Sequence, residues 1–143
     1  MLGKSLQNKK IVISGGASGI GWATTKICVA KGASVYLCDI DNLALNKIKK
    51  HSSYNKNIFA AKADASKETE VIKFFKIIKK KFKYLDCLIN NIGVAGPTGS
   101  IEKLNSRDWV RTLYVNVVSH FYFTKQAIPL IKKTKKGSII NIS

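Results

Sequence analysis

Short runs of β-branched and other apolar residues alternate with longer amphipathic stretches, and this alternation restricts the possible folds more than any other feature of the chain. It predicts five strands, at residues 10–14, 34–38, 58–61, 85–89 and 138–142. It predicts four helices, at residues 20–31, 42–50, 66–82 and 107–132. Such alternation is typical of an α/β fold with a doubly wound parallel sheet and helices on both faces. We therefore expect a single domain over residues 1–143 with the strand order 3-2-1-4-5.

Helical spacing predicts which side of two helices is buried. In the first helix, the apolar residues at this spacing are Ile20, Ala23, Ile27 and Ala30. In the third helix they are Val71, Phe74, Phe75 and Ile78. Because a serine hydroxyl can accept hydrogen bonds from the first helical amides, we also expect helix N-caps at Ser66 and Ser106.

A glycine-rich turn joins the first predicted strand to the first predicted helix. Its residues are Ser14, Gly15, Gly16, Ala17, Ser18, Gly19, Ile20 and Gly21. A diphosphate can reach main-chain amides only where no Cβ blocks them, and the amino end of a helix attracts its negative charge. Such a turn can be an ordinary strand–helix loop. Its place between a strand and a helix favours a Rossmann-like dinucleotide site.

Asp39 ends the second predicted strand, 18 residues after Gly21. A carboxylate there can accept hydrogen bonds from both adenosine ribose hydroxyls and would repel a 2′-phosphate. The alternative is a helix-capping or turn acid, a role that Asp41 could fill instead. Neither Trp22 nor Ile40 is basic, so the sequence favours NAD over NADP, and Ile40 is counted among the cofactor-binding positions.

The turn has the spacing Gly-x-x-x-Gly-x-Gly, and four further segments follow it in order. They are Ala63-Asp64-Ala65, Asn90-Asn91-Ile92-Gly93, Val115-Asn116 and the segment 137–143. Together these five motifs resemble the short-chain dehydrogenase/reductase family over essentially the whole chain. The resemblance implies that Asp64 and Ala65 contact the adenine. It implies that Asn91, Ile92 and Gly93 lie beside the cofactor's ribose, although Ile92 stands where alanine is usual.

The same resemblance implies an oxidoreductase that transfers hydride between NAD(H) and an alcohol or ketone, using an Asn-Ser-Tyr-Lys tetrad. Asn116 matches the asparagine, which keeps a water in the proton relay. None of the five tyrosines has lysine four residues later, and Ser143 matches the residue before the catalytic serine. We therefore expect an inactive N-terminal portion of a longer enzyme. The alternative is a complete, non-catalytic NAD-binding or partner-binding module.

The chain carries 25 basic and 8 acidic residues, a formal net charge of +17, and its only arginines are Arg107 and Arg111. One interpretation is a surface for nucleic acid or an anionic membrane. The other is a solvated coat of lysines. The second is favoured because the lysines are spread over several predicted helices and no nucleic-acid motif is present. We expect no specific nucleic-acid partner and no membrane partner.

The three cysteines, Cys28, Cys38 and Cys87, form no close pair, which fits a reducing cytoplasm and predicts no metal site. His120 is expected to be a packing or surface residue. No apolar run approaches the roughly 18 residues of a membrane span. The remaining expectations are a small alcohol or carbonyl substrate and, by resemblance, a homo-oligomer of the full-length protein.

Overall fold

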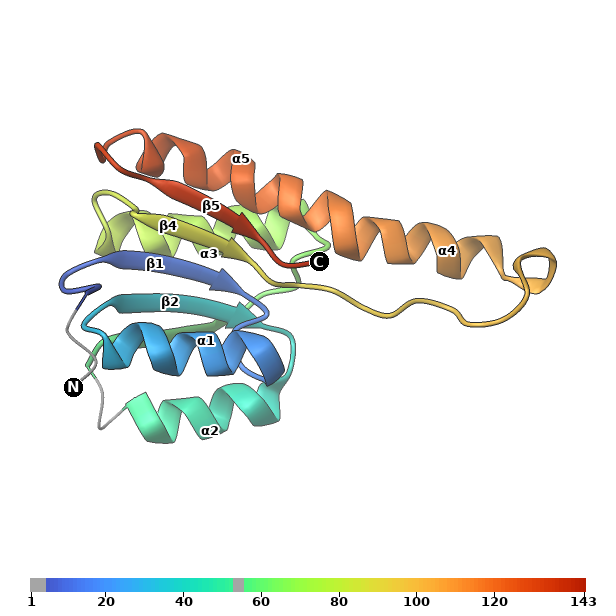
Figure 1. The fold of residues 1–143 in the computed structure, drawn as a ribbon, viewed down its shortest axis with the longest axis horizontal. Helices are drawn as coiled ribbons and strands as arrows, with labels where there is room; N and C mark the ends of the chain where they lie inside the picture. Colours follow the sequence, from blue (N-terminus) through green and yellow to red (C-terminus); the bar gives the residue numbers. More distant parts are fainter. Residues whose placement is uncertain (1–4, 53–55) are drawn as a thin grey trace.

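The computed structural model describes residues 5–52 and 56–143 as a parallel sheet with helices on both faces (Figure 1). The strands are β1 (Lys10–Ser14), β2 (Ser34–Asp39), β3 (Ile58–Lys62), β4 (Cys87–Asn90) and β5 (Ser138–Asn141). They lie in the order β3-β2-β1-β4-β5, and each neighbouring pair is parallel. The predicted fold class and strand order are confirmed. The order reverses between β1 and β4, so a crevice forms beyond the carboxyl ends of these two strands.

The helices are α1 (Gly19–Ala30), α2 (Asn42–Ser52), α3 (Glu68–Lys81), α4 (Ser106–Leu113) and α5 (Ser119–Ile131). A short 3₁₀ helix, η1 (Ile101–Lys103), precedes α4, and a π-helical turn, η2 (Tyr114–Val118), separates α4 from α5. The single α-helix predicted at 107–132 is therefore interrupted. The predicted N-cap at Ser106 is wrong, because the Asn105 side chain accepts from Arg107 N at 2.8 Å. No helix in the described part of the chain is long and apolar enough to span a bilayer.

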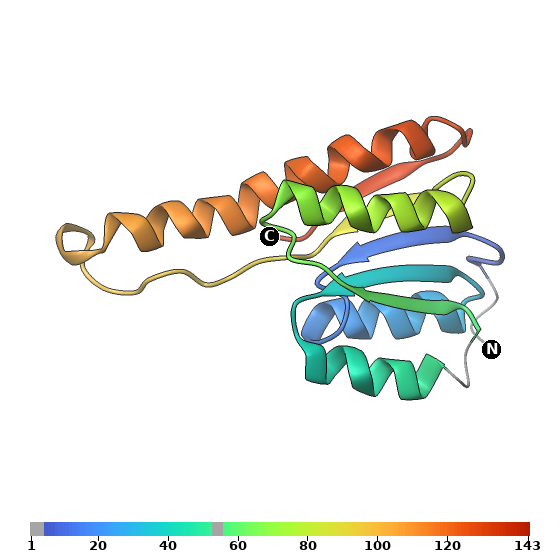
Figure 2. The ribbon, with the colours of Figure 1, turned by 180° about the vertical axis from the view of Figure 1, so that it is seen from behind.

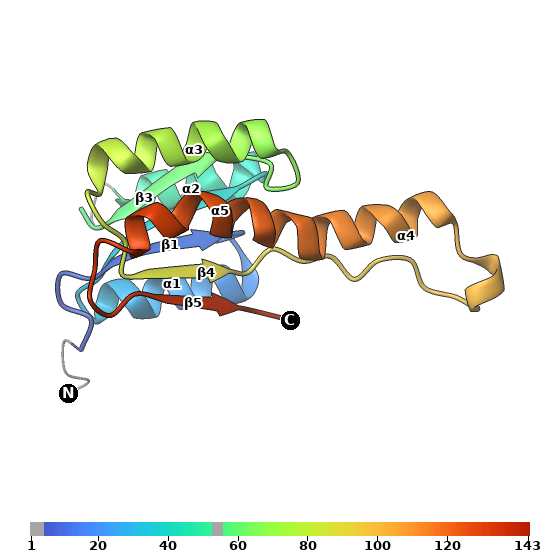
Figure 3. The same ribbon diagram turned by 90° about the horizontal axis from the view of Figure 1, so that it is seen from above.

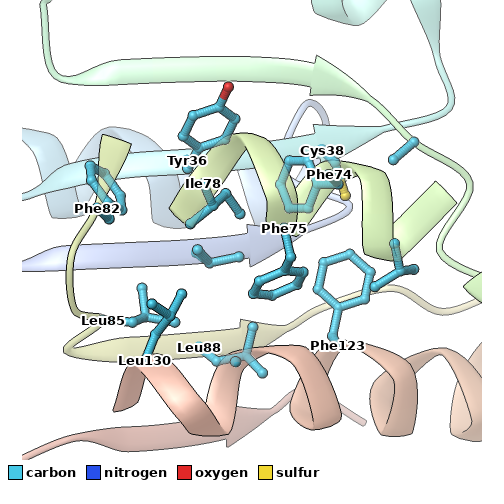
Figure 4. Close-up of a cluster of buried hydrophobic side chains, with 14 of the residues drawn as sticks. Tyr36, Cys38, Phe74, Phe75, Ile78, Phe82, Leu85, Leu88, Phe123 and Leu130 are labelled. Carbon is cyan, nitrogen blue, oxygen red and sulfur yellow. The ribbon is translucent and has the colours of Figure 1, made fainter. Parts of the chain in front are cut away.

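Two apolar layers attach the helices to the sheet. The layer under α3 and α5 is rich in aromatic rings, among them Phe74, Phe75 and Phe123 (Figure 4). The rings of Phe75 and Phe123 pack edge to face with their centroids 5.6 Å apart, and this contact joins α3 to α5. Seen from behind, these two helices cover one face of the sheet (Figure 2). The second layer lies under α1 and α2 and contains Ile13, Val29, Leu37, Leu45 and Ile48.

The buried face of α3 is the predicted one, but that of α1 is not. Ile20 and Ile27 are 65% and 57% exposed, and the helix instead buries Gly21, Thr25, Cys28 and Val29. Gly21 packs against the main chain of the preceding turn, and residues four and seven positions later share its face. Close packing at Gly21 therefore determines the rotation of α1, and the larger apolar residues lie outside.

An arm comprising residues 91–113 projects beyond the carboxyl edge of the sheet (Figures 1 and 3). It consists of the loop after β4, η1 and α4. Because α4 continues through η2 into α5, the arm is fixed to the sheet through α5, whose residues Phe123, Ala127 and Leu130 are buried. One wall of the crevice is therefore built by a helix that lies mostly outside the core.

Candidate functional site

The turn between β1 and α1 leaves no room for side chains at two positions. A Cβ on Gly21 would lie 2.1 Å from Gly15 O, and a Cβ on Gly16 would lie 2.6 Å from Leu37 Cβ. Gly15 and Gly19 have φ angles of +62° and +50°, which residues with side chains rarely adopt. A Cβ on Gly19 would meet no heavy atom within 4 Å, so this part of the turn borders open space. Bare main chain therefore faces the crevice.

The amino end of α1 points into the same region. Its N-cap, Ser18, makes no side-chain capping bond within the described residues, and the first turn of α1 contains no acidic residue. The first amides of the helix therefore lack a side-chain acceptor, and the helix dipole adds a positive potential there. An anionic group suits this position.

The Asp39 carboxylate, whose residue is 9% exposed, is bonded to the turns on both sides of it. Its Oδ2 accepts from Ala17 N at 3.1 Å, and its Oδ1 accepts from Asp41 N at 3.1 Å. Asp39 therefore orders the glycine-rich turn, a role that the sequence pattern did not predict. Each carboxylate oxygen has a second lone pair and can still accept a hydrogen bond from a ligand.

The helix-capping role considered for Asp39 belongs to Asp41. The Oδ1 atom of Asp41 accepts from Leu43 N at 2.8 Å and from Ala44 N at 3.2 Å, at the start of α2. Asp39 is therefore not needed as a helix cap.

Asp64 belongs to a charged network before α3. Its Oδ1 accepts from Ser66 N at 3.0 Å and from Ser66 Oγ at 2.6 Å, and Asp64 N donates to Glu70 Oε2 at 2.8 Å. Lys67 Nζ lies 3.3 Å from Asp64 Oδ2. Burial acts to raise the pKa of Asp64, but the hydrogen bonds from Ser66 and Lys67 outweigh it and hold the pKa below its usual value. The predicted N-cap at Ser66 is wrong, since its hydroxyl bonds to Asp64 and α3 begins at Glu68.

Asn91 and Ser14 join the carboxyl ends of β4 and β1. Asn91 N donates to Ser14 Oγ at 3.1 Å, and Asn91 Nδ2 donates to Gly15 O at 2.8 Å. The preceding residue, Asn90, is fully buried and donates from Nδ2 to Asn141 Oδ1 at 2.9 Å. The segment after β4 is therefore fastened to the glycine-rich turn on one side and to β5 on the other.

Asn116 and His120 hold the next part of that segment. Asn116 Oδ1 accepts from Val94 N at 2.8 Å, and Asn116 Nδ2 donates to Val94 O at 2.9 Å. One helical turn later, His120 Nε2 lies 2.9 Å from Ile92 O. Asn116 lies within η2, and π-helical turns occur frequently at functional sites. His120 therefore contacts the segment after β4 that borders the site. The only sequence signal for this contact was the spacing of four residues between His120 and Asn116.

A cavity of about 800 Å³ lies where these turns meet. The predicted site residues that line it are Gly15, Ser18, Asp39, Ile40, Asp64, Ala65, Asn91, Ile92 and Gly93. Six other predicted residues are in the same turn but do not line it: Ser14, Gly16, Ala17, Gly19, Ile20 and Gly21. Asn116 also lies outside the lining and reaches it through Val94, which is a lining residue.

Residues of α4 and η2 form a further wall. It comprises Ser106, Arg107, Val110, Arg111, Tyr114 and Val115, of which only Val115 belongs to one of the sequence motifs. Both arginines of the chain therefore border the cavity. Their contribution depends on how α4 projects over the crevice, which no local pattern encodes.

Two of the three cysteines lie in the core. Cys28 and Cys38 are buried, and burial raises the pKa of the Cys38 thiol to about 12. No group of three or more His, Cys, Asp or Glu side chains that could hold a metal occurs in the described ranges.

Comparison with known proteins agrees with this geometry. A family model described as short chain dehydrogenase matches residues 9–143. The chain belongs to the short-chain dehydrogenase family. The family resemblance of the five motifs is thereby confirmed.

Relatives within the short-chain dehydrogenase family come from distant organisms. A CLA biosynthesis dehydrogenase/reductase of Lactiplantibacillus plantarum is 32% identical over 142 residues, covering 98% of this chain and 49% of that protein. A tropinone reductase homologue of Arabidopsis thaliana is 34% identical over 143 residues, covering 97% of this chain and 53% of that protein. The chain thus spans about half the length of the curated relatives it matches.

Solved structures of short-chain dehydrogenases superpose on most of the chain. One is a 3-ketoacyl-(acyl-carrier-protein) reductase from Brucella melitensis complexed with NADH, with 28% identity and a TM-score of 0.88. The superposition covers 97% of this chain and 58% of the reductase chain. Another is the Pseudomonas aeruginosa RhlG/NADP active-site complex, with 26% identity and a TM-score of 0.88. The superposition covers 98% of this chain and 56% of the RhlG chain.

Proposed function

We propose that this short-chain dehydrogenase chain binds NAD(H) in the cavity at the carboxyl edge of the sheet. The whole protein would then be an oxidoreductase acting on a small alcohol or carbonyl compound. One observation carries the proposal: Gly15 of the glycine-rich turn, the α1 N-cap Ser18 and the Asp39 carboxylate all line one cavity. A dinucleotide has a diphosphate for the first two and ribose hydroxyls for the third.

The glycine-rich turn fits a diphosphate sterically and electrostatically. Gly21 and Gly16 allow α1 and β2 to pack against the turn, and Gly19 leaves open space beside the first helical amides. Asp39 bonds to Ala17 N and so holds the turn in this conformation. The turn is therefore preorganised, and an anion bound there would cost little further ordering of the backbone.

The roles of the remaining site residues are carried over from the motif match, and their position in the cavity lining supports them. Asp64, Ala65 and Ile40 would border the adenosine, and Asn91, Ile92 and Gly93 would border the other ribose. The bound nicotinamide would supply or accept the hydride. Asn116 uses both polar groups of its side chain on Val94, so its side chain positions the loop, and its part in a proton relay rests on the motif match.

The choice of NAD over NADP rests on the charge of Asp39. A carboxylate at the end of β2 would repel a 2′-phosphate, and the adjacent Ile40 offers no compensating positive charge. Since the solved relatives include one complex with NADH and one with NADP, the family alone does not decide this preference.

Apolar side chains on the outer face of α4 to α5 support a homo-oligomer. Trp109, Leu113, Val117 and Phe121 are all exposed and recur at helical spacing. An exposed apolar stripe of this kind is typical of a protein–protein interface. A second copy of the chain would cover it by a two-fold contact.

Titration with NADH and NADPH, followed by fluorescence, tests the proposal. The protein should bind NADH more tightly than NADPH. Asp39→Ala should weaken NADH binding more than NADPH binding, because the substitution removes the repulsion of the 2′-phosphate as well as the hydrogen bonds to the ribose. If Asp39 only orders the turn, both affinities will fall by the same factor, and the ribose assignment is wrong.

The matched control is Asp41→Ala, which removes an exposed acid two residues away and the cap of α2. This variant should leave the ratio of the two affinities unchanged. Absence of binding to both dinucleotides by the folded wild-type protein would refute the proposed function.

A further inference from the structure

Lysines from separate parts of the chain gather at the amino-terminal edge of the sheet, opposite the cavity. In a parallel sheet all strands begin at one edge, and the intervening helices end there; in Figure 1 this edge is on the left. Seven lysines lie at these helix ends, and we call them the basic edge: Lys31 after α1, Lys80 and Lys83 at the end of α3, and Lys132, Lys133, Lys135 and Lys136 after α5.

Main-chain hydrogen bonds tie these helix ends to the loops around the strand starts. Leu85 N donates to Leu130 O at 3.2 Å, which brings the end of α5 next to the segment that carries Lys83. Leu6 N donates to Lys31 O at 3.1 Å, which fastens the end of α1 to the segment before β1. From the sequence, the lysines were expected to be spread over the whole surface, because they belong to different helices. The fold brings the ends of those helices together.

Acidic residues do not neutralise the basic edge. Asp86 is at this end, but its Oδ1 accepts from Lys9 Nζ at 2.9 Å and its Oδ2 accepts from Lys10 N at 2.8 Å. The other acidic residues lie towards the carboxyl edge or on the arm: Asp39, Asp41, Asp64, Glu68, Glu70, Glu102 and Asp108. None of the seven lysines of the basic edge is ion-paired with a described carboxylate. The positive charge of the basic edge is therefore not compensated by nearby carboxylates.

Contrary to the expectation from the sequence of no membrane partner, we infer that the basic edge docks on membrane surfaces that contain anionic lipids. Clustered lysines are attracted to such surfaces without requiring a shaped site, because each long side chain can reach a headgroup independently. Tyr84, 38% exposed and adjacent to Lys83, adds an aromatic side chain of the kind found at membrane interfaces.

Composition and helix orientation favour lipid over nucleic acid. The basic edge contains no arginine, the residue that most often reads bases and clamps phosphates in a fork. No described helix lies along this face to enter a groove, since α1, α3 and α5 meet it end-on.

Docking in this orientation would direct the cavity away from the membrane. The cavity is lined by residues at the carboxyl ends of the strands, at the opposite edge of the sheet. The proposed cofactor site would therefore remain open to water, and dinucleotide binding should be independent of docking.

Sedimentation with vesicles tests this inference. The protein is mixed with phosphatidylcholine vesicles containing no phosphatidylserine or roughly 30 mol% of it, at about 0.1 M salt. Binding should require phosphatidylserine. Substitution of Lys132, Lys133, Lys135 and Lys136 by Gln should lower the partition coefficient by roughly 600-fold, since each of the four lysines at such a surface is expected to contribute a factor of roughly five.

The matched control replaces Lys26, Lys73, Lys76 and Lys103 by Gln. These exposed lysines lie away from the basic edge, and the net charge changes by the same amount. The control should lower partitioning less than about threefold. Circular dichroism verifies that both variants are folded.

Three results would overturn the inference: binding that does not depend on phosphatidylserine, an equal loss in both quadruple variants, or tighter binding to a short DNA duplex that the first variant alone abolishes. The last result would assign the basic edge to nucleic acid.

Discussion

Asn116 holds the main chain of Val94 by both of its polar groups, since its Oδ1 accepts from Val94 N at 2.8 Å and its Nδ2 donates to Val94 O at 2.9 Å. This pair of bonds resembles the pairing of two strands, but here a side chain on a π-helical turn serves as one partner. Val94 lines the cavity, whereas Asn116 does not. The asparagine therefore shapes the site from behind the loop.

Replacing Asn116 by Ala should lower the free energy of unfolding by about 1–2 kcal/mol, because two hydrogen bonds to the loop are lost. Urea unfolding followed by circular dichroism measures the change. Asn46→Ala, at an exposed position on α2, is the control for the higher helix propensity of alanine, and should be neutral or stabilising. Equal stability of the two variants would show that the loop does not depend on Asn116.

Gly21→Ala should destabilise the protein by about 3 kcal/mol, because its Cβ would overlap the Gly15 carbonyl oxygen and force α1 away from the turn. Gly93→Ala is the matched control. Its nearest non-neighbouring heavy atom would be Asn116 Oδ1 at 3.6 Å, and its φ is not in the left-handed region, so we expect a change below about 1 kcal/mol. Thermal unfolding of both variants distinguishes a steric requirement for glycine from a general sensitivity of the crevice.

Cys38 should resist alkylation in the folded protein. Burial raises the pKa of its thiol to about 12, so at pH 8 the thiolate is present at a fraction on the order of 10⁻⁴. Cys87, which is only partly buried, should react with iodoacetamide before Cys38. Peptide mass spectrometry after timed labelling measures the order, and all three cysteines should react in denaturant. Early labelling of Cys38 would indicate that β2 is accessible to solvent.

The network around Asp64 should contribute to stability only above acidic pH. Hydrogen bonds hold the pKa of Asp64 below its unfolded value, so the native state binds fewer protons than the unfolded state as the pH falls. The contribution is complete above the unfolded pKa, near 4, and is lost as the pH falls through the lower folded value.

Melting temperatures between pH 6 and pH 3 should therefore decline less steeply in Asp64→Asn than in the wild type. Asp108→Asn, the same change on α4, should retain the wild-type slope. Identical slopes in all three proteins would mean that the Asp64 network does not stabilise the fold.

Local chemistry carried much of the information in this sequence. Alternating strand and helix periods predicted the strands and helices, and the glycines of the turn predicted where main chain is bared, because both depend on residues close together in the chain. The position of Asp39 at the end of β2, 18 residues after Gly21, likewise predicted that it belongs to the site, and Asp39 lines the cavity.

Tertiary packing decided the rest. Contact between Gly21 and Gly15 O rotated α1, so that Ile20 and Ile27 face outward despite their helical spacing. The projection of α4 placed Arg107 and Arg111 over the cavity, and the common direction of the helices collected scattered lysines at one edge. These outcomes depend on contacts between segments distant in sequence, and a periodic pattern within one segment does not specify which of its faces another segment will cover.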